Sequence, residues 1–244
     1  MAAQRAGRAA GAAAAPDGAA APPGALIVAC ALGIERLALG RADRPGAPDP
    51  LAVIRTGMGP RAAERAVGAA LAAPGMDGAA LVATGFCAGL VPGMHPGDLV
   101  VATETRDPRG TVLCDGTALL AETLARLLPG RTVHTGPLTG ADHVVRGNER
   151  AELRAATGAV AVDMESAATL WAAARLRTPA GEHAAGPGPA GRPPVAAVRV
   201  IVDAPEHELV RIGTVRGGIS AFRVLRAVLP AFFDWHRSLL LPRR

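Results

Sequence analysis

Apolar residues along this chain gather into short continuous runs, and each run is followed by glycine or polar residues and then by helical spacing. Continuous apolar runs of this length are typical of strands buried on both faces. The expected strands cover residues 25–32, 51–55, 79–83, 99–105, 133–138 and 195–202, with a short one ending at Asp163. The expected helices cover residues 60–71, 117–128, 149–157 and 218–241, with others beginning at Glu35 and running through Trp171 to Leu176. This alternation predicts a three-layer α/β fold.

The most informative stretch lies around Met164, where the end of a strand meets the start of a helix. It places Asp163 and Glu165 on either side of Met164, and the apolar run 195–202 ends on Asp203. Ligands of α/β sheets bind at the carboxyl ends of strands, and a carboxylate can accept two hydrogen bonds from a vicinal diol such as ribose. The alternative interpretation is that the first two acids only cap the helix. Their pairing with Asp203 favours one shared site.

Two glycine-rich segments follow strands and are expected to be turns that approach a ligand closely. They are residues 56–60 and residues 84–90. The first lacks the third glycine of a dinucleotide fingerprint and the Gly-Lys-Ser/Thr of a phosphate-binding loop. After the first strand, Glu35 is either a charge that complements a helix start or a catalytic base above the sheet edge.

The two ends of the chain and one internal segment define the domain organisation. Residues 1–24 are Ala, Gly and Pro with little else, and we expect a disordered tail. They lack the leucine-rich centre of a secretory signal, and no later stretch has the roughly 18 uninterrupted apolar residues that a membrane span requires. Residues 25–244 are expected to form one domain, with a flexible insertion at 178–194.

Composition narrows the class of protein further. All 26 basic residues are Arg, which suggests the coding bias of a GC-rich genome, so the net charge of +5 is weak evidence for nucleic acid. No basic patch is interleaved with aromatic residues. The three cysteines, Cys30, Cys87 and Cys114, are widely spaced and favour a reducing cytoplasm over a disulfide framework. The His residues show no zinc-binding pattern, so we expect neither a metal nor an organic cofactor.

Five segments, in this order, resemble the purine nucleoside phosphorylase and nucleosidase superfamily, above all its methylthioadenosine/S-adenosylhomocysteine nucleosidases. They are Arg55-Thr56-Gly57-Met58-Gly59, residues 83–90, Pro96-Gly97-Asp98-Leu99-Val100-Val101, residues 162–168 and Arg199-Val200-Ile201-Val202-Asp203. The chain is also similar to the hopanoid-associated phosphorylases, which are thought to remove adenine from adenosylhopane. The resemblance implies a mixed sheet partly closed into a barrel, flanked by helices, that cleaves the N-glycosidic bond of a purine nucleoside as a homodimer or higher homo-oligomer.

The resemblance also implies a role for individual residues. Asp203 would protonate or hydrogen-bond N7 of the purine, because adenine leaves poorly as an anion. Glu165 would hold the ribose hydroxyls beside Asp163, and it would stabilise the cationic ribosyl transition state. Met164 would pack on the sugar. The residues that would lie along the base are Phe86, Cys87, Ala88, Val144 and Val145.

Two nucleophiles are compatible with this set, water and phosphate. Glu35 matches the residue that activates water in the nucleosidases. The first loop carries no Arg, which favours hydrolysis, although Arg55, Arg106 and Arg146 keep phosphate open as a co-substrate. The alternative from another class is a nucleoside-binding module that has lost catalysis. The presence of Asp203 argues against it.

The C-terminal stretch 218–241 contains Phe222, Phe232, Phe233 and Trp235, which are most of the aromatic residues, at helical spacing. One interpretation packs this face on the sheet or on a second subunit. The other makes it, with residues 178–194, an apolar entrance for a lipidic nucleoside near a membrane, with its arginines toward anionic headgroups. The side chains concerned are Phe222, Leu225, Val228, Leu229, Phe232, Phe233, Trp235, Arg223, Arg226, Arg237, Arg243 and Arg244.

Overall fold

The structure is a computed structural model, and it describes residues 24–40, 45–76, 78–175, 192–205 and 214–239, without the side chains of 214–219. Nearly all of the expected tail 1–24 and most of the expected insertion 178–194 lie outside these residues. Its strands are β1 (Leu26–Cys30), β2 (Leu51–Arg55), β3 (Ala80–Gly89), β4 (Leu99–Asp107), β5 (Gly110–Leu113), β6 (Val133–Gly140), β7 (Ala161–Asp163) and β8 (Val195–Asp203). Its helices are α1 (Gly33–Leu39), α2 (Pro60–Leu71), α3 (Thr117–Leu127), α4 (Glu149–Thr157), α5 (Ser166–Ala174), α6 (Thr214–Ala227) and α7 (Leu229–Leu239).

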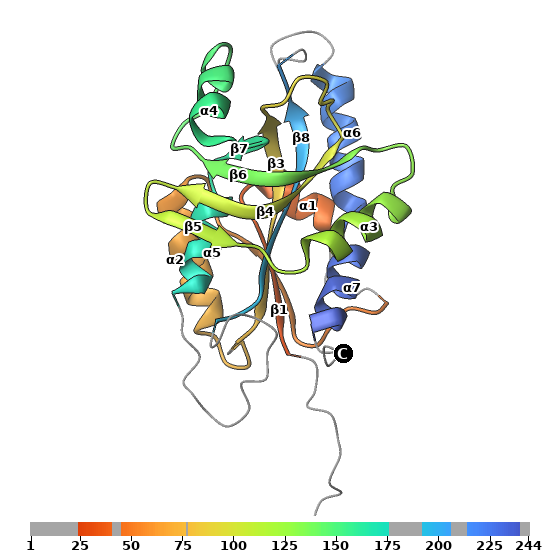
Figure 1. Cartoon of the computed structure of the whole chain (residues 1–244). Helices are drawn as coiled ribbons and strands as arrows, with labels where there is room; N and C mark the ends of the chain where they lie inside the picture. Colours follow the sequence, from red (N-terminus) through yellow and green to blue (C-terminus); the bar gives the residue numbers. More distant parts are fainter. Residues whose placement is uncertain (1–23, 41–44, 77, 176–191, 206–213, 240–244) are drawn as a thin grey trace, which may run out of the picture.

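The strands form one mixed sheet that closes on itself in part. Its order is β2-β1-β3-β7-β6-β4-β5, and β8 pairs with both β3 and β4. The second set of pairings closes a ring of β3, β7, β6, β4 and β8, while β1 and β2 extend from it as an open wing. The predicted α/β class and the mixed sheet partly closed into a barrel are confirmed (Figure 1).

Helices cover the sheet on two sides, which gives the three layers. Helices α2 and α5 pack together on one side, and α1, α3, α6 and α7 lie on the other (Figure 1). Side chains along β1 point alternately to the two faces of the sheet. Leu26 and Val28 belong to the hydrophobic core on one face, and Ile27 and Ala29 belong to the core on the other. Both faces of β1 are therefore buried, as the continuous apolar run predicted.

Strand β3 corrects the predicted turn at residues 84–90. The strand continues through this segment to Gly89 and pairs with β8 along its length. A glycine inside a strand often marks a close approach of another group rather than a turn. At Gly85, which has φ +134°, a Cβ atom would lie 2.7 Å from Nη1 of Arg199 and closer still to the Glu35 carboxylate. The glycine therefore makes room for these side chains.

The C-terminal stretch forms two helices where the sequence predicted one. Helix α6 ends at Ala227 and α7 begins at Leu229, with Pro230 in its first turn. Proline has no amide hydrogen to donate and fits the start of a helix better than its interior. A further element that the sequence analysis missed is β5, which forms a hairpin with β4 around Pro108.

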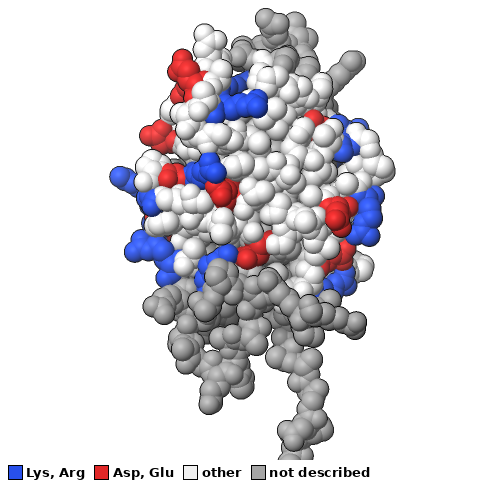
Figure 2. Space-filling model, in the orientation of Figure 1, with Lys and Arg blue, Asp and Glu red and all other residues white. Residues whose placement is uncertain are grey.

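The apolar face of α6 and α7 lies in the core, as the first of the two interpretations predicts. Leu225, Val228 and Phe232 are fully buried there, and Trp235 donates a hydrogen bond to the backbone oxygen of Asp115. These side chains are thus unavailable to a membrane or a lipidic ligand. None of the described helices is long and apolar enough to cross a bilayer. On the face shown in Figure 2, basic and acidic residues are interspersed.

Candidate active site

All ten residues singled out from the sequence line one cavity of about 700 Å³, measured out to its open mouth. The predicted residues are Glu35, Phe86, Cys87, Ala88, Val144, Val145, Asp163, Met164, Glu165 and Asp203. The sequence analysis assigned no role to the other lining residues, which are Ala31, Leu32, Met58, His143, Val162 and Val202. The walls come from the β1–α1 junction, the turn before α2, β3, the loop after β6, the β7–α5 junction and the end of β8.

Ala88 of β3 shows why the acids converge. It pairs with Val162 of β7 on one side and with Asp203 of β8 on the other. The pairing with β8 shifts register between Cys87 and Ala88, a β-bulge of the kind that re-aims side chains near active sites. Two strands that each end on an acid therefore flank the same residue, and their carboxylates face one cavity.

Glu35 is fixed by three backbone amides. Its Oε2 accepts hydrogen bonds from Ala31 N at 2.9 Å and Leu32 N at 2.8 Å, and its Oε1 accepts one from Phe86 N at 2.7 Å. Glu35 as a whole is 2% exposed. Glu35 thus binds the start of α1 and also lines the cavity, and its role as a catalytic base stays a prediction. A carboxylate has about four acceptor positions, so Oε1 retains one toward the cavity.

Asp163 and Glu165 divide the two roles that the sequence left open. Asp163 binds the first turn of α5, since its Oδ1 accepts hydrogen bonds from Ser166 N at 3.0 Å and Glu165 N at 3.3 Å. Glu165 makes no such cap. Its Oε1 accepts a hydrogen bond from Gly59 N at 2.9 Å, and burial raises the pKa of this carboxyl group, an effect that the charge of Arg199 opposes. Glu165 is thus the acid with acceptor capacity left for a ligand.

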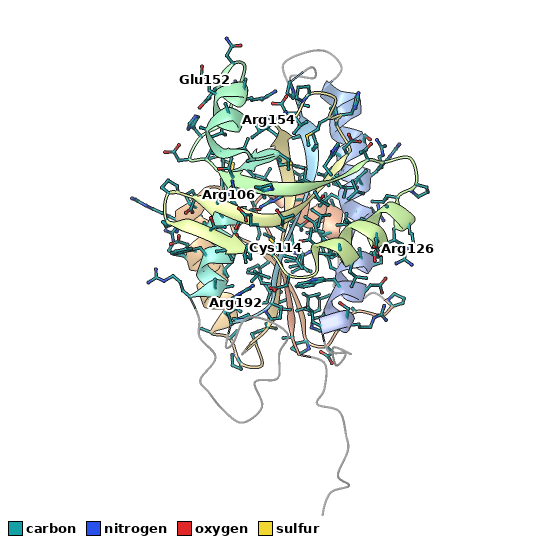
Figure 3. The ribbon with its side chains drawn as sticks, in the orientation of Figure 1. Arg106, Cys114, Arg126, Glu152, Arg154 and Arg192 are labelled. Atoms are coloured by element: carbon teal, nitrogen blue, oxygen red, sulfur yellow. The ribbon has the colours of Figure 1, made fainter. Side chains whose placement is uncertain are left out.

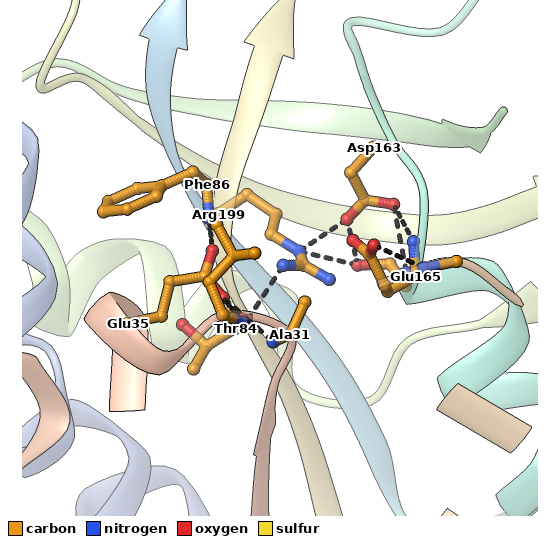
Figure 4. A network of polar contacts seen from close by, with 10 residues as sticks. Ala31, Glu35, Thr84, Phe86, Asp163, Glu165 and Arg199 are labelled. Carbon is orange, nitrogen blue, oxygen red and sulfur yellow. Dashed lines mark hydrogen bonds and ion pairs between the residues drawn. The ribbon is translucent and has the colours of Figure 1, made fainter. Parts of the chain in front are cut away.

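Arg199 lies between the two groups of acids, with Glu35 on one side and Asp163 and Glu165 on the other (Figure 4). It is 1% exposed, forms an ion pair with Asp163 at 2.6 Å, and donates hydrogen bonds to Ser166 Oγ and the Thr84 carbonyl. Burial would lower its pKa, but the carboxylates of Asp163, Glu35 and Glu165 outweigh burial and raise it. The guanidinium therefore remains a cation that holds the acids around it.

The sequence analysis quoted Arg199 within a motif and gave it no role. The signal was present, because a single Arg interrupts an otherwise apolar strand, β8. A charge buried inside a strand must be paired. Candidate partners were the acids at neighbouring strand ends.

The residues expected beside a purine form an apolar wall. Val145 is 4% exposed, whereas Val144 is 57% exposed and therefore lies at the mouth of the cavity. Cys87 and Ala88 line the cavity from strand β3, which corrects their predicted place in a turn. Burial raises the pKa of the Cys87 thiol far above its usual range, so it is a neutral packing group and no nucleophile.

The three arginines that kept phosphate open do not line the cavity. Arg106, for example, pairs with Glu104 and donates to the Thr157 carbonyl. Within the described parts of the chain, no group of three or more His, Cys, Asp or Glu side chains is arranged to hold a metal ion.

A family model described as the phosphorylase superfamily matches residues 36–229 of the chain. The chain belongs to the phosphorylase superfamily. Membership in the phosphorylase superfamily confirms the predicted kinship and the prediction of an enzyme. No curated protein sequence matches the chain.

Several solved structures share the fold of this phosphorylase-superfamily chain. The 5′-methylthioadenosine/S-adenosylhomocysteine nucleosidase of S. pneumoniae, in complex with a transition-state inhibitor, is 21% identical, with a TM-score of 0.67, and the match covers 86% of this chain and 98% of that one. The corresponding nucleosidase of Colwellia psychrerythraea 34H, in complex with adenine, is 18% identical, with a TM-score of 0.66 and coverage of 89% and 96%. The futalosine hydrolase of Helicobacter pylori is 15% identical, with a TM-score of 0.65 and coverage of 87% and 98%.

Proposed function

We propose that this enzyme hydrolyses the N-glycosidic bond of a 5′-modified adenine nucleoside and releases adenine. The observation that carries the proposal is the convergence of Glu35, Glu165 and Asp203 on one cavity with an apolar wall. The superfamily and the shared fold with nucleosidases that bind adenine or a transition-state inhibitor support it.

In this proposal Asp203 acts on the base. Cleavage leaves the bonding electrons on the purine, and a proton or hydrogen bond delivered to N7 stabilises them. A positioned acid contributes about two to four decades of rate in such a step. Asp203 is 5% exposed and lies opposite Ala88, beside the wall where the base would lie.

Glu165 acts on the sugar. Its carboxylate would accept hydrogen bonds from the ribose hydroxyls while Oε1 also accepts the hydrogen bond from Gly59 N. The ribosyl group becomes cationic as the base departs, so a fixed carboxylate stabilises the transition state more than the ground state. Met164, between the two acids, would pack on the sugar ring, and Asp163 positions Glu165 through its backbone amide.

Water is the nucleophile that the site favours. The remaining acceptor position of Glu35 can take a proton from water as it attacks C1′. Phosphate would instead meet four carboxylates, and no Arg is among the residues that line the cavity. Arg199 is committed to Asp163, Ser166 and Thr84. Phosphorolysis thus lacks an anion-binding group at the cavity wall.

The mouth of the cavity suits an apolar 5′ substituent. Met58 and Val144 line it and are 68% and 57% exposed. A methylthio group would contact them, and so would the near end of a lipid such as the hopane of adenosylhopane. Ile34 and Leu37 of α1 are also exposed beside this site, and a second copy of the chain would cover them. We place the enzyme in the cytoplasm, where its free thiols would remain reduced.

The decisive experiment incubates the protein with methylthioadenosine, S-adenosylhomocysteine, inosine and adenosylhopane, with and without phosphate, and measures free base. We expect adenine from a 5′-thio nucleoside without phosphate. Release that strictly requires phosphate would establish phosphorolysis. Tight binding of a nucleoside without release would establish a binding module. Asp203→Asn serves as the control, because it keeps the volume of the side chain and removes the acid.

A further inference from the structure

Arg150, in the first turn of α4, lies directly behind the wall of the cavity. Its side chain is 3% exposed, and its Nη2 forms an ion pair with Oδ2 of Asp203. Its Nε donates a hydrogen bond to the carbonyl of Val145 at 3.4 Å. One guanidinium therefore contacts both the acid and the apolar segment between which the base would lie. The sequence analysis gave this residue no role.

The position of Arg150 separates two hollows in the molecule. Asp203 and Val145 line the nucleoside cavity, whereas Arg150 lines a neighbouring hollow together with Asn148 and Arg154. Arg150 therefore does not reach the cavity itself and acts on a ligand only through its two partners. Its Nη1 is buried without a partner among the described residues. Burial of a cation with an unpaired donor costs free energy, so this ion pair is weak evidence of a stabilising role.

We propose that Arg150 is a positioning residue that holds the carboxyl group of Asp203 and the Val145 carbonyl in a fixed relation on either edge of the leaving base. This inference rests on the proposed function. Arginine suits the task because its planar fork binds two acceptors at once in fixed geometry, which the single ammonium of lysine does not.

The chemistry explains why the cation would accelerate the step. The Asp203 O–H bond breaks as its proton passes to N7 of the purine. The C1′–N9 bond breaks, its electron pair goes to the base and neutral adenine leaves, while C1′ bonds to the oxygen of water and Glu35 takes the proton that this water loses. Asp203 is left as a carboxylate beside Arg150, and a charge-assisted hydrogen bond stabilises that carboxylate more than the acid before it. The stabilisation therefore grows along the reaction.

Leaving-group dependence separates positioning of the acid from mere support of the fold. We would compare Arg150→Met with the parent on two ribosides that share the same 5′-methylthio group. One carries adenine, which needs a proton at N7. The other carries 4-nitrophenolate, which leaves without one. Arg154→Met is the matched control, because Arg154 lies one turn further along α4, is exposed and lines the same outer hollow (Figure 3).

The expected result is selective. In Arg150→Met, kcat for adenine release falls by roughly two decades, the range of acid catalysis, while KM and nitrophenolate release stay within about threefold. Arg154→Met leaves both substrates unchanged. Equal losses on both substrates would show that Arg150 only supports the fold and would overturn the inference, and so would undiminished adenine release.

A second variant keeps the test decisive if Arg150→Met does not fold. Arg150→Lys retains the charge, so we expect it to fold and to show intermediate adenine release with normal nitrophenolate release. Parental adenine release in this variant would show that charge alone suffices and would overturn the positioning role. If the parent enzyme releases neither leaving group, the proposed function itself fails, and the inference fails with it.

Discussion

The carboxylate of Glu165 accepts a hydrogen bond from the backbone amide of Gly59 at 2.9 Å, across 106 positions of the chain. Gly59 has φ +84° and immediately precedes Pro60, the first residue of α2. This conformation is disfavoured for every residue with a side chain. The sequence predicted that this glycine-rich turn approaches the ligand. In the structure the turn contacts Glu165, the acid that we propose binds the ribose.

Gly59→Ala tests this contact. The positive φ should cost about 1–2 kcal/mol of unfolding free energy, and relief of the strain would turn the amide away from Glu165. We expect a several-fold rise in KM for the nucleoside. The control is Gly75→Ala, at φ +79° with open space around it and outside the cavity. It should lose similar stability and keep KM. A KM effect of equal size in both variants would contradict the role of the contact.

Glu165→Gln should separate activity from stability. Burial raises the pKa of Glu165 above its ordinary value of 4.5, so the charged form is destabilised in the folded protein. The folded state therefore gains relative stability below the unfolded pKa and loses it as pH rises through the raised folded pKa. At neutral pH the neutral amide should thus melt at a higher temperature than the parent, with kcat/KM reduced.

The same shift makes a kinetic prediction. Ribose binding by a carboxylate should fail as pH falls through the raised pKa of Glu165, so the acidic limb of kcat/KM should lie above pH 4.5. A profile of the parent between about pH 4 and about pH 8 measures this limb. Its persistence in Glu165→Gln would assign it to another group.

Arg199→Met should be severely destabilising. It leaves Asp163 buried without its ion-pair partner, and breaking a buried pair in this way costs about 3–5 kcal/mol. Urea unfolding measures the loss. The control is Arg237→Met, whose pair with Asp234 is exposed and should contribute about 0–1 kcal/mol. Similar losses in the two variants would mean that the acids around Arg199 relax into solvent.

His143, on the rim of the cavity, should make stability depend on pH. Hydrogen bonds to Asp142 at 2.7 Å and Glu149 at 2.6 Å raise its pKa above its ordinary value of 6.5. The stability that protonated His143 contributes to the fold is therefore fully present below the pKa of the unfolded state and is lost as pH rises through the pKa of the folded state. The melting temperature of the parent should exceed that of His143→Asn more at about pH 5.5 than at about pH 9. A difference independent of pH would show that protonation of His143 does not contribute.

The sequence predicted those parts of the fold that depend on local pattern. Apolar runs gave the principal strands, because burial on both faces leaves no polar positions, and acids at strand ends marked one cavity. The segment around Gly85 was misread because glycine serves two purposes, and here it accommodates Glu35 and Arg199 rather than a turn. Arg150 carried no signal, since its partner Asp203 lies 53 positions away and nothing in the first turn of α4 indicates burial.

Strand β3 pairs with β1, β7 and β8, so Phe86, Cys87 and Ala88 belong to a strand that three neighbouring strands hold in place. The opposite side of the cavity comes from Met58 and from the loop that contains Val144, neither of which is in a strand. A substitution in β3 disturbs packing on both faces of the sheet. A substitution at the mouth of the cavity changes only the shape of its opening. Divergence of substrate range in descendants of this protein would therefore accumulate at the mouth, while the half of the site that acts on the glycosidic bond is inherited with the barrel.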